Sequence, residues 1–287
     1  MVCAARSSAG VLDSEICGAG VIGWSLKRES VQSLKGRESR SPQKCLAVVH
    51  RTIDMRKVMG GNPLSDPLWN ALATEHAHFM IGAGRARRYP AEVAPFAAVA
   101  DHSPASWVDL EQLLGPEEHI YLCGPEPAGT SGLRVGAPLA THQMVWPSRT
   151  PIEADRGRMA IVRMTAADAD AMVALTTLAF PGFFRERTHE MGNYYGIRID
   201  GELVAMAGER LALPGMREIS AVVTHPGHTG KGYARMLMNC LLREHANAGV
   251  TSFLHVGVRN TRAVSLYERM GFAFAGSITL WPVSLAE

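Results

Sequence analysis

The chain has 287 residues, enough for one large domain or two smaller ones with a substantial core. Its formal net charge of +2 gives no basic surface for nucleic acid or an anionic membrane, and no apolar run reaches the ~18 residues of a membrane-spanning helix. Five cysteines without the spacing of a disulfide framework indicate a reducing compartment, so we expect a cytoplasmic protein. Histidines and cysteines do not cluster, and no metal site is expected.

Residues 1–54 are rich in serine, glycine, arginine and lysine and lack sustained hydrophobic periodicity, which predicts a disordered leader. The mixture of arginine and serine is also typical of a transit peptide, although several acidic residues argue against one. A third alternative is that translation starts at Met55 or Met59. The sequence leaves the three alternatives open.

Residues 55–150 are predicted to form an N-terminal α/β domain. A helix is expected over residues 67–80, capped by Asp66, and a second over residues 106–114. Strands follow in the prediction, at 119–123 and within 133–146.

A linker rich in proline and charged residues is expected over 147–158, followed by a strand at 159–164. Thr165 and Asp168 then resemble a capping box that opens a helix ending before Pro181.

The next predicted elements are three strands. Asp200-Gly201 is a tight-turn dipeptide and joins strands 194–199 and 202–209 as a hairpin. A proline–glycine turn leads into the third strand, 217–224.

Residues 225–235, His-Pro-Gly-His-Thr-Gly-Lys-Gly-Tyr-Ala-Arg, lie between an apolar strand and a run with helical periodicity. Such a glycine-bearing turn at a helix N-terminus is a ready anion site. A Walker A loop is excluded because Lys231 is followed by Gly232 instead of Ser or Thr. The Rossmann fingerprint is excluded because Arg235 stands where its last glycine should be.

Residues 260–272 form the second motif, Asn-Thr-Arg-Ala-Val-Ser-Leu-Tyr-Glu-Arg-Met-Gly-Phe. Asn260 is a good N-cap, and Gly271 is suited to end the helix at C′. The apolar residues between them recur at helical spacing, and Phe272 returns the chain to a strand.

Both stretches resemble motifs of the GNAT superfamily of acyl-CoA-dependent N-acyltransferases. Residues 229–234 are similar to the family's pyrophosphate loop, [RQ]-x-x-G-x-[GA], with Thr229 in place of Arg or Gln. Residues 260–272 match N-x-x-A-x-x-L-Y-x-x-x-G-F at every named position. The resemblance covers roughly residues 159–285.

The resemblance implies an α/β (α+β) fold for a catalytic domain at 159–287. Its mixed, mostly antiparallel sheet would have central parallel strands that splay apart, with flanking helices. The helix–helix–strand order of residues 55–150 is similar to the start of the same fold. That half is therefore either a degenerate copy or a packing or substrate-specificity domain.

By the same resemblance, acetyl-CoA is the co-substrate and lies between strands 217–224 and 251–258. The amide of Val222 would donate to the thioester oxygen during catalysis. Thr229 departs from the family pattern, although Lys231 or Arg235 can supply charge. The residues implied in cofactor binding are Val222, Val223, Thr224, Thr229, Gly230, Lys231, Gly232, Tyr233, Ala234 and Asn260.

The implied reaction is direct attack of a primary amine on acetyl-CoA in a ternary complex. Glu218 shares strand parity with Val222 and is the candidate base; the alternative is an ion pair with Arg217 or Arg210. Tyr267 occupies the position of the family's general acid, and the alternative is a core tyrosine. A non-catalytic acyl-CoA-binding regulatory module is the rival function.

The acceptor is a small-molecule or peptide amine whose identity the sequence leaves open. Residues 180–187, Phe-Pro-Gly-Phe-Phe-Arg-Glu-Arg, are expected to border its site. Their aromatic rings suggest an apolar wall, and their arginines suit an acidic acceptor. A solvated loop is the alternative.

Overall fold

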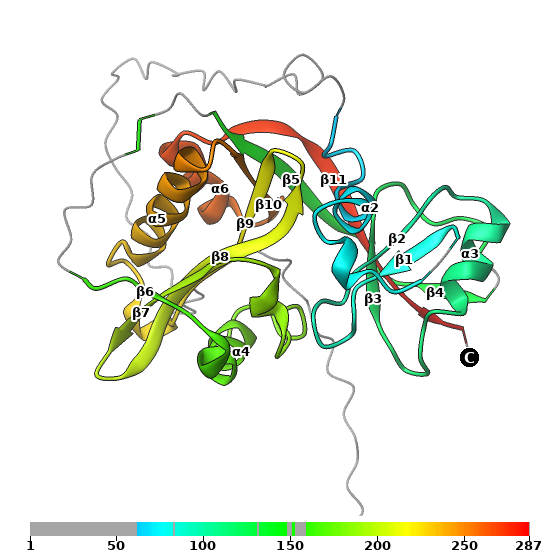
Figure 1. Cartoon of the computed structure of the whole chain (residues 1–287), viewed down its shortest axis with the longest axis horizontal. Coiled ribbons are helices and arrows are strands. Elements are labelled where there is room, and N and C mark those ends of the chain that lie inside the picture. Colours follow the sequence, from blue (N-terminus) through cyan, green and yellow to red (C-terminus); the bar gives the residue numbers. More distant parts are fainter. Residues whose placement is uncertain (1–61, 83, 131, 148–150, 153–158, 287) are drawn as a thin grey trace, which may run out of the picture.

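The computed structural model describes residues 62–147 except 83 and 131, residues 151–152, and residues 159–286 (Figure 1). The predicted leader, 1–54, and most of the predicted linker lie outside the described residues. Helices of the described part are α2 Pro67–Ala73, η1 Ala77–Phe79, α3 Pro104–Glu111, η2 Ala166–Asp168, α4 Ala169–Thr177, η3 Thr188–Met191, η4 Pro226–His228, α5 Tyr233–Asn247 and α6 Thr261–Met270. Strands are β1 Ala86–Arg88, β2 Ala97–Val99, β3 Ile120–Cys123, β4 Leu133–Val135, β5 Leu139–Trp146, β6 Val162–Arg163, β7 Tyr194–Ile199, β8 Glu202–Leu213, β9 Met216–Thr224, β10 Thr251–Gly257 and β11 Ala273–Leu285.

Among the described residues, nine strands form one sheet in the order β3-β11-β5-β10-β9-β8-β7-β6, with β4 also paired to β11. Neighbouring strands of this sheet are antiparallel except β9 and β10, which are parallel. The mixed, mostly antiparallel sheet expected from the resemblance is confirmed. Strands β1 and β2 form a separate two-stranded sheet.

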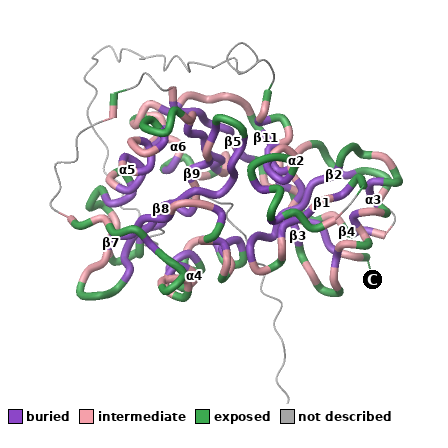
Figure 2. The backbone as a smooth tube through the Cα atoms, in the orientation of Figure 1, coloured by how far each residue is buried: buried purple, intermediate pink, exposed green. Residues whose placement is uncertain are grey.

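Different helices cover the two faces of the large sheet (Figures 1 and 2). Helices α5 and α6 pack on one face, where their apolar stripes contact Val222, Leu254 and Val256. Helices α2 and α4 pack on the other face, around Ala221 and Phe253. Within the described part of the chain, no helix combines the length and apolar character needed to cross a membrane.

Local capping signals place several elements where the sequence predicts them. The side chain of Asp66 accepts a hydrogen bond from the backbone N–H of Trp69 at 3.0 Å and begins α2. The capping box at Thr165 and Asp168 is present. Asp200 and its following glycine both have positive φ, at 49° and 87°, which is the geometry of a two-residue hairpin turn.

Other elements are shorter than predicted. The helix expected over residues 67–80 ends at Ala73, since the ring of His76 turns inward to a 2.9 Å hydrogen bond with the hydroxyl of Tyr89. The strand expected at 159–164 is reduced to Val162–Arg163.

The predicted boundary between two domains does not separate two sheets. Strand β5, from the N-terminal half, lies between β10 and β11 of the C-terminal half and is antiparallel to both. Strands β3 and β4 extend the same sheet beyond β11. Because β5 brings together two strands of the C-terminal half, the described halves share the large sheet and one hydrophobic cluster.

We therefore expect a fragment of residues 159–287 not to fold on its own. Removing β5 leaves the facing edges of β10 and β11 without a partner and opens the core beneath them. Circular dichroism should show no cooperative thermal transition for the fragment, whereas the full chain melts cooperatively. A sharp transition in the fragment would contradict the shared sheet.

Candidate functional site

Strands β9 and β10 run side by side for three residue pairs and then part. The last pair is Glu218 with Phe253, although β9 continues to Thr224 and β10 to Gly257. We call this point the fork. Beyond the fork β10 stays paired with β5, and β9 stays paired with β8. The edges of β9 and β10 that face each other across the opening are therefore unpaired. The splayed parallel strands predicted from the sequence are present.

A β-bulge in β9 lies directly beyond the fork. Between the pairs Ser220–Gly208 and Val223–Met206, β9 has one residue more than β8, and Ala221 has a φ of 50°. The extra residue reverses the side-chain alternation. As a result Val222 packs with α5, whereas Ala221 and Val223 pack on the α4 face. The predicted shared parity of Glu218 and Val222 is therefore wrong.

The glycine loop after β9 borders a cavity of about 650 Å³ that reaches from α5 to α6. Gly230 and Gly232 have φ values of 80° and 81°, and a Cβ added to either would meet no atom within 4 Å. Gly232 is the N-cap of α5 and is left-handed, so the first amides of that helix face an open cradle. Of the predicted cofactor residues, the following line the cavity: Thr224, Thr229, Gly230, Lys231, Gly232, Tyr233 and Ala234.

The cavity has a strongly cationic lining. The side chains of Lys231, Arg235, Arg262 and Arg269 border it, and the described lining residues include no carboxylate. Together with the helix N-terminus, these cations favour a ligand with several negative charges. The cavity also includes Trp146 of β5, whose indole N–H donates to the carbonyl of Met270 at 3.3 Å.

Sequence reasoning missed the two arginines of α6. Arg262, Leu266 and Arg269 are spaced four and three residues apart, so they lie on one helical face. That spacing is visible in the sequence and could have predicted them. Trp146 carried no comparable signal, because the pairing of β5 with β10 is a long-range contact.

Besides Glu218, four of the predicted site residues do not line the cavity. Val222 and Tyr267 are buried in the same cluster, on the α5 face of the sheet. Burial raises the pKa of the Tyr267 phenol, which therefore stays protonated at neutral pH. Asn260 caps α6 as predicted, accepting a hydrogen bond from the N–H of Ala263 at 3.1 Å. Val223 packs on the opposite face.

Glu218 is fully buried and bound on both carboxylate oxygens. Arg210 donates to each oxygen, at 2.9 Å and 2.5 Å, and His255 Nδ1 lies 2.8 Å from Oε1. Burial alone would raise the pKa of Glu218, but the charge of Arg210 and the contact with His255 outweigh it and lower the pKa to about 2. The alternative ion pair with Arg210 is the arrangement observed, and it argues against Glu218 as the base.

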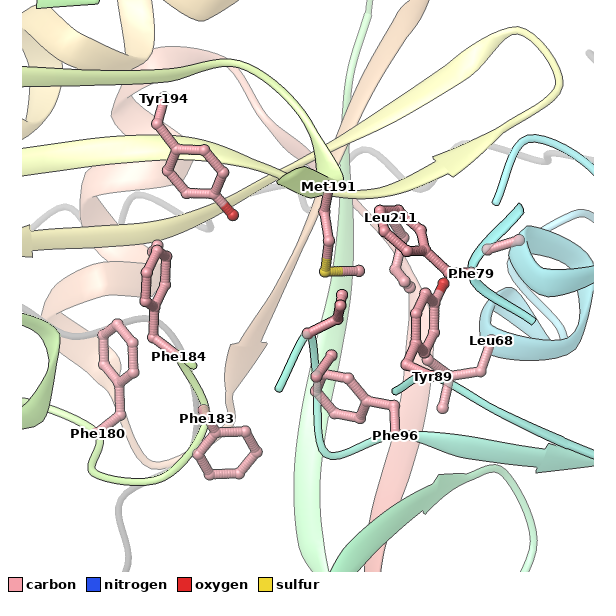
Figure 3. Packing of buried hydrophobic residues seen from close by; sticks show 14 of the residues in the cluster. Leu68, Phe79, Tyr89, Phe96, Phe180, Phe183, Phe184, Met191, Tyr194 and Leu211 are labelled. Carbon is pink, nitrogen blue, oxygen red and sulfur yellow. The ribbon is translucent and has the colours of Figure 1, made fainter. Parts of the chain in front are cut away.

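The predicted acceptor wall is buried rather than solvated. Phe180, Phe183 and Phe184 follow α4 and pack on the same side of the sheet as residues of the N-terminal half (Figure 3). Phe183 stacks on Tyr121 with ring centroids 4.5 Å apart. Arg187 forms ion pairs with Glu92 and Glu190. Because these carboxylates compensate its charge, Arg187 is poorly suited to bind an acidic acceptor.

The model of the Acetyltransferase (GNAT) family matches residues 163–272. A solved GNAT-family protein from Novosphingobium aromaticivorans is 33% identical, over 79% of this chain and 100% of that one, with a TM-score of 0.72. The chain belongs to the GNAT acetyltransferase family.

Two further comparisons concern the fold and the length of the chain. An N-acetyltransferase from Kribbella flavida is 17% identical over 74% of this chain and 95% of that one, and its TM-score of 0.52 shows a shared fold. An uncharacterized protein of Mycobacterium leprae is 31% identical over 150 residues, which is 48% of this chain. The chain covers 41% of the length of that curated relative.

The loop of this GNAT protein can be tested at Gly232. Valine there would be forced into a left-handed backbone, at a cost of about 1–2 kcal/mol, and would place methyl groups in the cradle. Isothermal titration calorimetry should show that Gly232→Val weakens acetyl-CoA binding at least about tenfold.

Gly249, beyond the other end of α5, is a matched control. It has a φ of 68° and open space around its Cα, so Gly249→Val meets a similar backbone strain far from the cavity. Thermal melting should show a comparable loss of stability in both variants, with normal acetyl-CoA affinity in Gly249→Val. If the two variants bound acetyl-CoA with equal affinity, the loop at Gly232 would have no specific role in binding this ligand.

Proposed function

We propose that the protein is a cytoplasmic N-acetyltransferase that moves an acetyl group from acetyl-CoA to a primary amine of a small molecule or peptide. The observation that carries the proposal is the cationic cavity at the N-terminus of α5. Thr224, the last residue of β9, lines this cavity, so the cavity adjoins the open end of that strand. A polyanionic ligand in this cavity can extend an uncharged arm into the fork. Cys123 and Cys240 form no disulfide within the described residues, which agrees with a reducing compartment.

The cavity fits the phosphates of acetyl-CoA on two counts. Its glycine cradle leaves room for a phosphate to approach backbone amides, and Lys231, Arg262 and Arg269 offset the ligand's charge. Thr229 supplies no charge where the family pattern has Arg or Gln, and the arginines of α6 compensate for this departure.

The fork supplies the groups that the transfer itself requires. Val222 has no register partner in β8 or β10, which suits its backbone N–H to a donor role toward the acetyl carbonyl oxygen as negative charge develops there. The buried phenol of Tyr267 lies in the same cluster and can give its proton to the leaving thiolate.

The acceptor amine would approach from the α4 face, opposite α5. Aromatic side chains cover that face, and the Tyr194 hydroxyl is buried there without a hydrogen-bond partner among the described residues (Figure 3). An acceptor with an apolar body and one polar group beside its amine would satisfy this surface.

Turnover tests the proposal against a non-catalytic acyl-CoA-binding module. The protein is incubated with acetyl-CoA and n-butylamine, phenethylamine, putrescine or alanine amide, and thiol release is followed with a chromogenic reagent. Amine-dependent release with an acetylated product in mass spectrometry is expected. Tight binding of acetyl-CoA without release in the presence of any amine would favour the module.

The acid role of Tyr267 has its own variant. Tyr267→Phe removes the hydroxyl but keeps the buried ring, so folding and acetyl-CoA affinity should be retained. Turnover should fall by ~10²-fold, because the thiolate leaves without its proton. Unchanged turnover would leave Tyr267 as a core residue.

A further inference from the structure

The carboxylate of Glu218 has no remaining capacity to accept a proton from substrate. Oε1 accepts from Arg210 Nη2 and His255 Nδ1, and Oε2 accepts from Arg210 Nε and the backbone N–H of Leu211. Two donors on each oxygen occupy its lone pairs. A group that stays ionised down to a pKa of about 2 is also a weak base.

The saturated carboxylate fixes the tautomer of His255. Because Glu218 is ionised and can only accept, the hydrogen bond of 2.8 Å requires a proton on His255 Nδ1. In the neutral ring the lone pair is then on Nε2. This is the relation by which a carboxylate orients a histidine base in enzymes.

The side-chain amide of Gln143 faces His255 Nε2. Its Nε2 donates one hydrogen to the carbonyl of Leu64 at 2.8 Å, and its second hydrogen is directed at His255 Nε2, 3.1 Å away. With the Nδ1 proton directed at Glu218, His255 Nε2 is the acceptor of this contact.

The described titratable groups that interact with Glu218, the partner of His255, add little net charge. Arg210 and Glu218 compensate each other as an ion pair. Burial raises the pKa values of Tyr89, Tyr194 and Cys123 and so keeps these groups neutral. Burial also lowers the pKa of His76, to about 4.

His255 lies on the α4 face of the sheet, from which the proposed acceptor would approach. It is two residues beyond the fork on β10, on the same strand face as Phe253, which packs toward α4. It keeps 9% of its surface exposed, whereas Glu218 keeps none. An amine that replaces Gln143 as the donor to Nε2 would meet the lone pair directly.

We propose that His255 is the catalytic base of this acetyltransferase and that Glu218 is its positioning residue. The inference rests on the proposed function. The amine nitrogen forms a bond to the acetyl carbon while its N–H bond breaks, and that proton passes to His255 Nε2. The carbon–sulfur bond breaks in turn, and the thiolate takes a proton from the Tyr267 hydroxyl. His255 then returns its proton to solvent, and Tyr267 regains one from solvent.

His255→Asn separates the chemical role from the structural one. The asparagine amide can still donate to Glu218 in place of Nδ1–H, but it lacks a basic nitrogen at the position of Nε2. With the amine that gives the fastest thiol release, kcat should fall by ~10²-fold or more while acetyl-CoA affinity and melting temperature are retained. His142→Gln is the matched control, because this β5 histidine bonds to Ser277 outside the network; its kcat should not change.

Gln143→Glu tests the same proton by a shift in pH dependence. A carboxylate beside Nε2 stabilises the protonated ring and raises its pKa, and a base works only when deprotonated. The acidic limb of kcat/KM should therefore move to higher pH than in wild type with the same amine, whose own pKa is unchanged.

The outcomes distinguish this inference from the proposed function. Wild-type thiol release together with an undiminished kcat in His255→Asn, or with an unmoved acidic limb in Gln143→Glu, would overturn the role of His255 alone. An absence of amine-dependent release by the wild type would overturn the proposed function and the base with it.

Discussion

The buried ion pair between Arg210 and Glu218 is the interaction on which the site depends. Glu218 belongs to the last residue pair of β9 and β10. Its side chain is almost fully buried, and that of Arg210 is largely buried. A charge pair in that position is tolerable because each carboxylate oxygen is hydrogen-bonded twice. Replacing either partner by an apolar residue would leave an uncompensated charge inside the sheet and would disturb the fork itself.

Two irregularities of the sheet place this pair. Strand β8 has one residue more than β9 between the pairs Glu209–Ile219 and Ala212–Arg217, and β9 has one more than β8 around Ala221. The first bulge turns Arg210 toward Glu218, and the second lets β9 leave β10. Glu209, beside Arg210, instead bonds to His245 on the α5 face, at 2.7 Å. The same point of the sheet thus carries one buried ionic contact on the α5 face and another on the α4 face.

Sequence alone predicted what local chemistry determines. The caps at Asp66 and Asn260, the hairpin at Asp200 and the helix end at Gly271 each follow from the residue at that position. The insertion of β5 between β10 and β11 could not be predicted, since it depends on pairing between distant segments.

The assignment of Glu218 shows the same limit at the level of the site. Its position on the strand was predicted, but its partners come from β8 and β10, and a bulge at Ala221 cancels the parity argument. His255 drew no attention in the sequence because a histidine within an apolar strand carries no motif. Its significance arises from contacts with Glu218 and Gln143, which belong to two other strands.

Hydrogen–deuterium exchange with and without acetyl-CoA tests the fork most directly. In the free protein, the amides of β9 beyond Glu218 and of residues 229–234 should exchange faster than the amides of β10 that pair with β5. Their exchange should slow markedly when acetyl-CoA is added. Amides of β10 that pair with β5 should be slow in both states. If acetyl-CoA leaves the exchange of residues 221–224 unchanged while it binds, the ligand does not enter the fork, and the site described here is wrong.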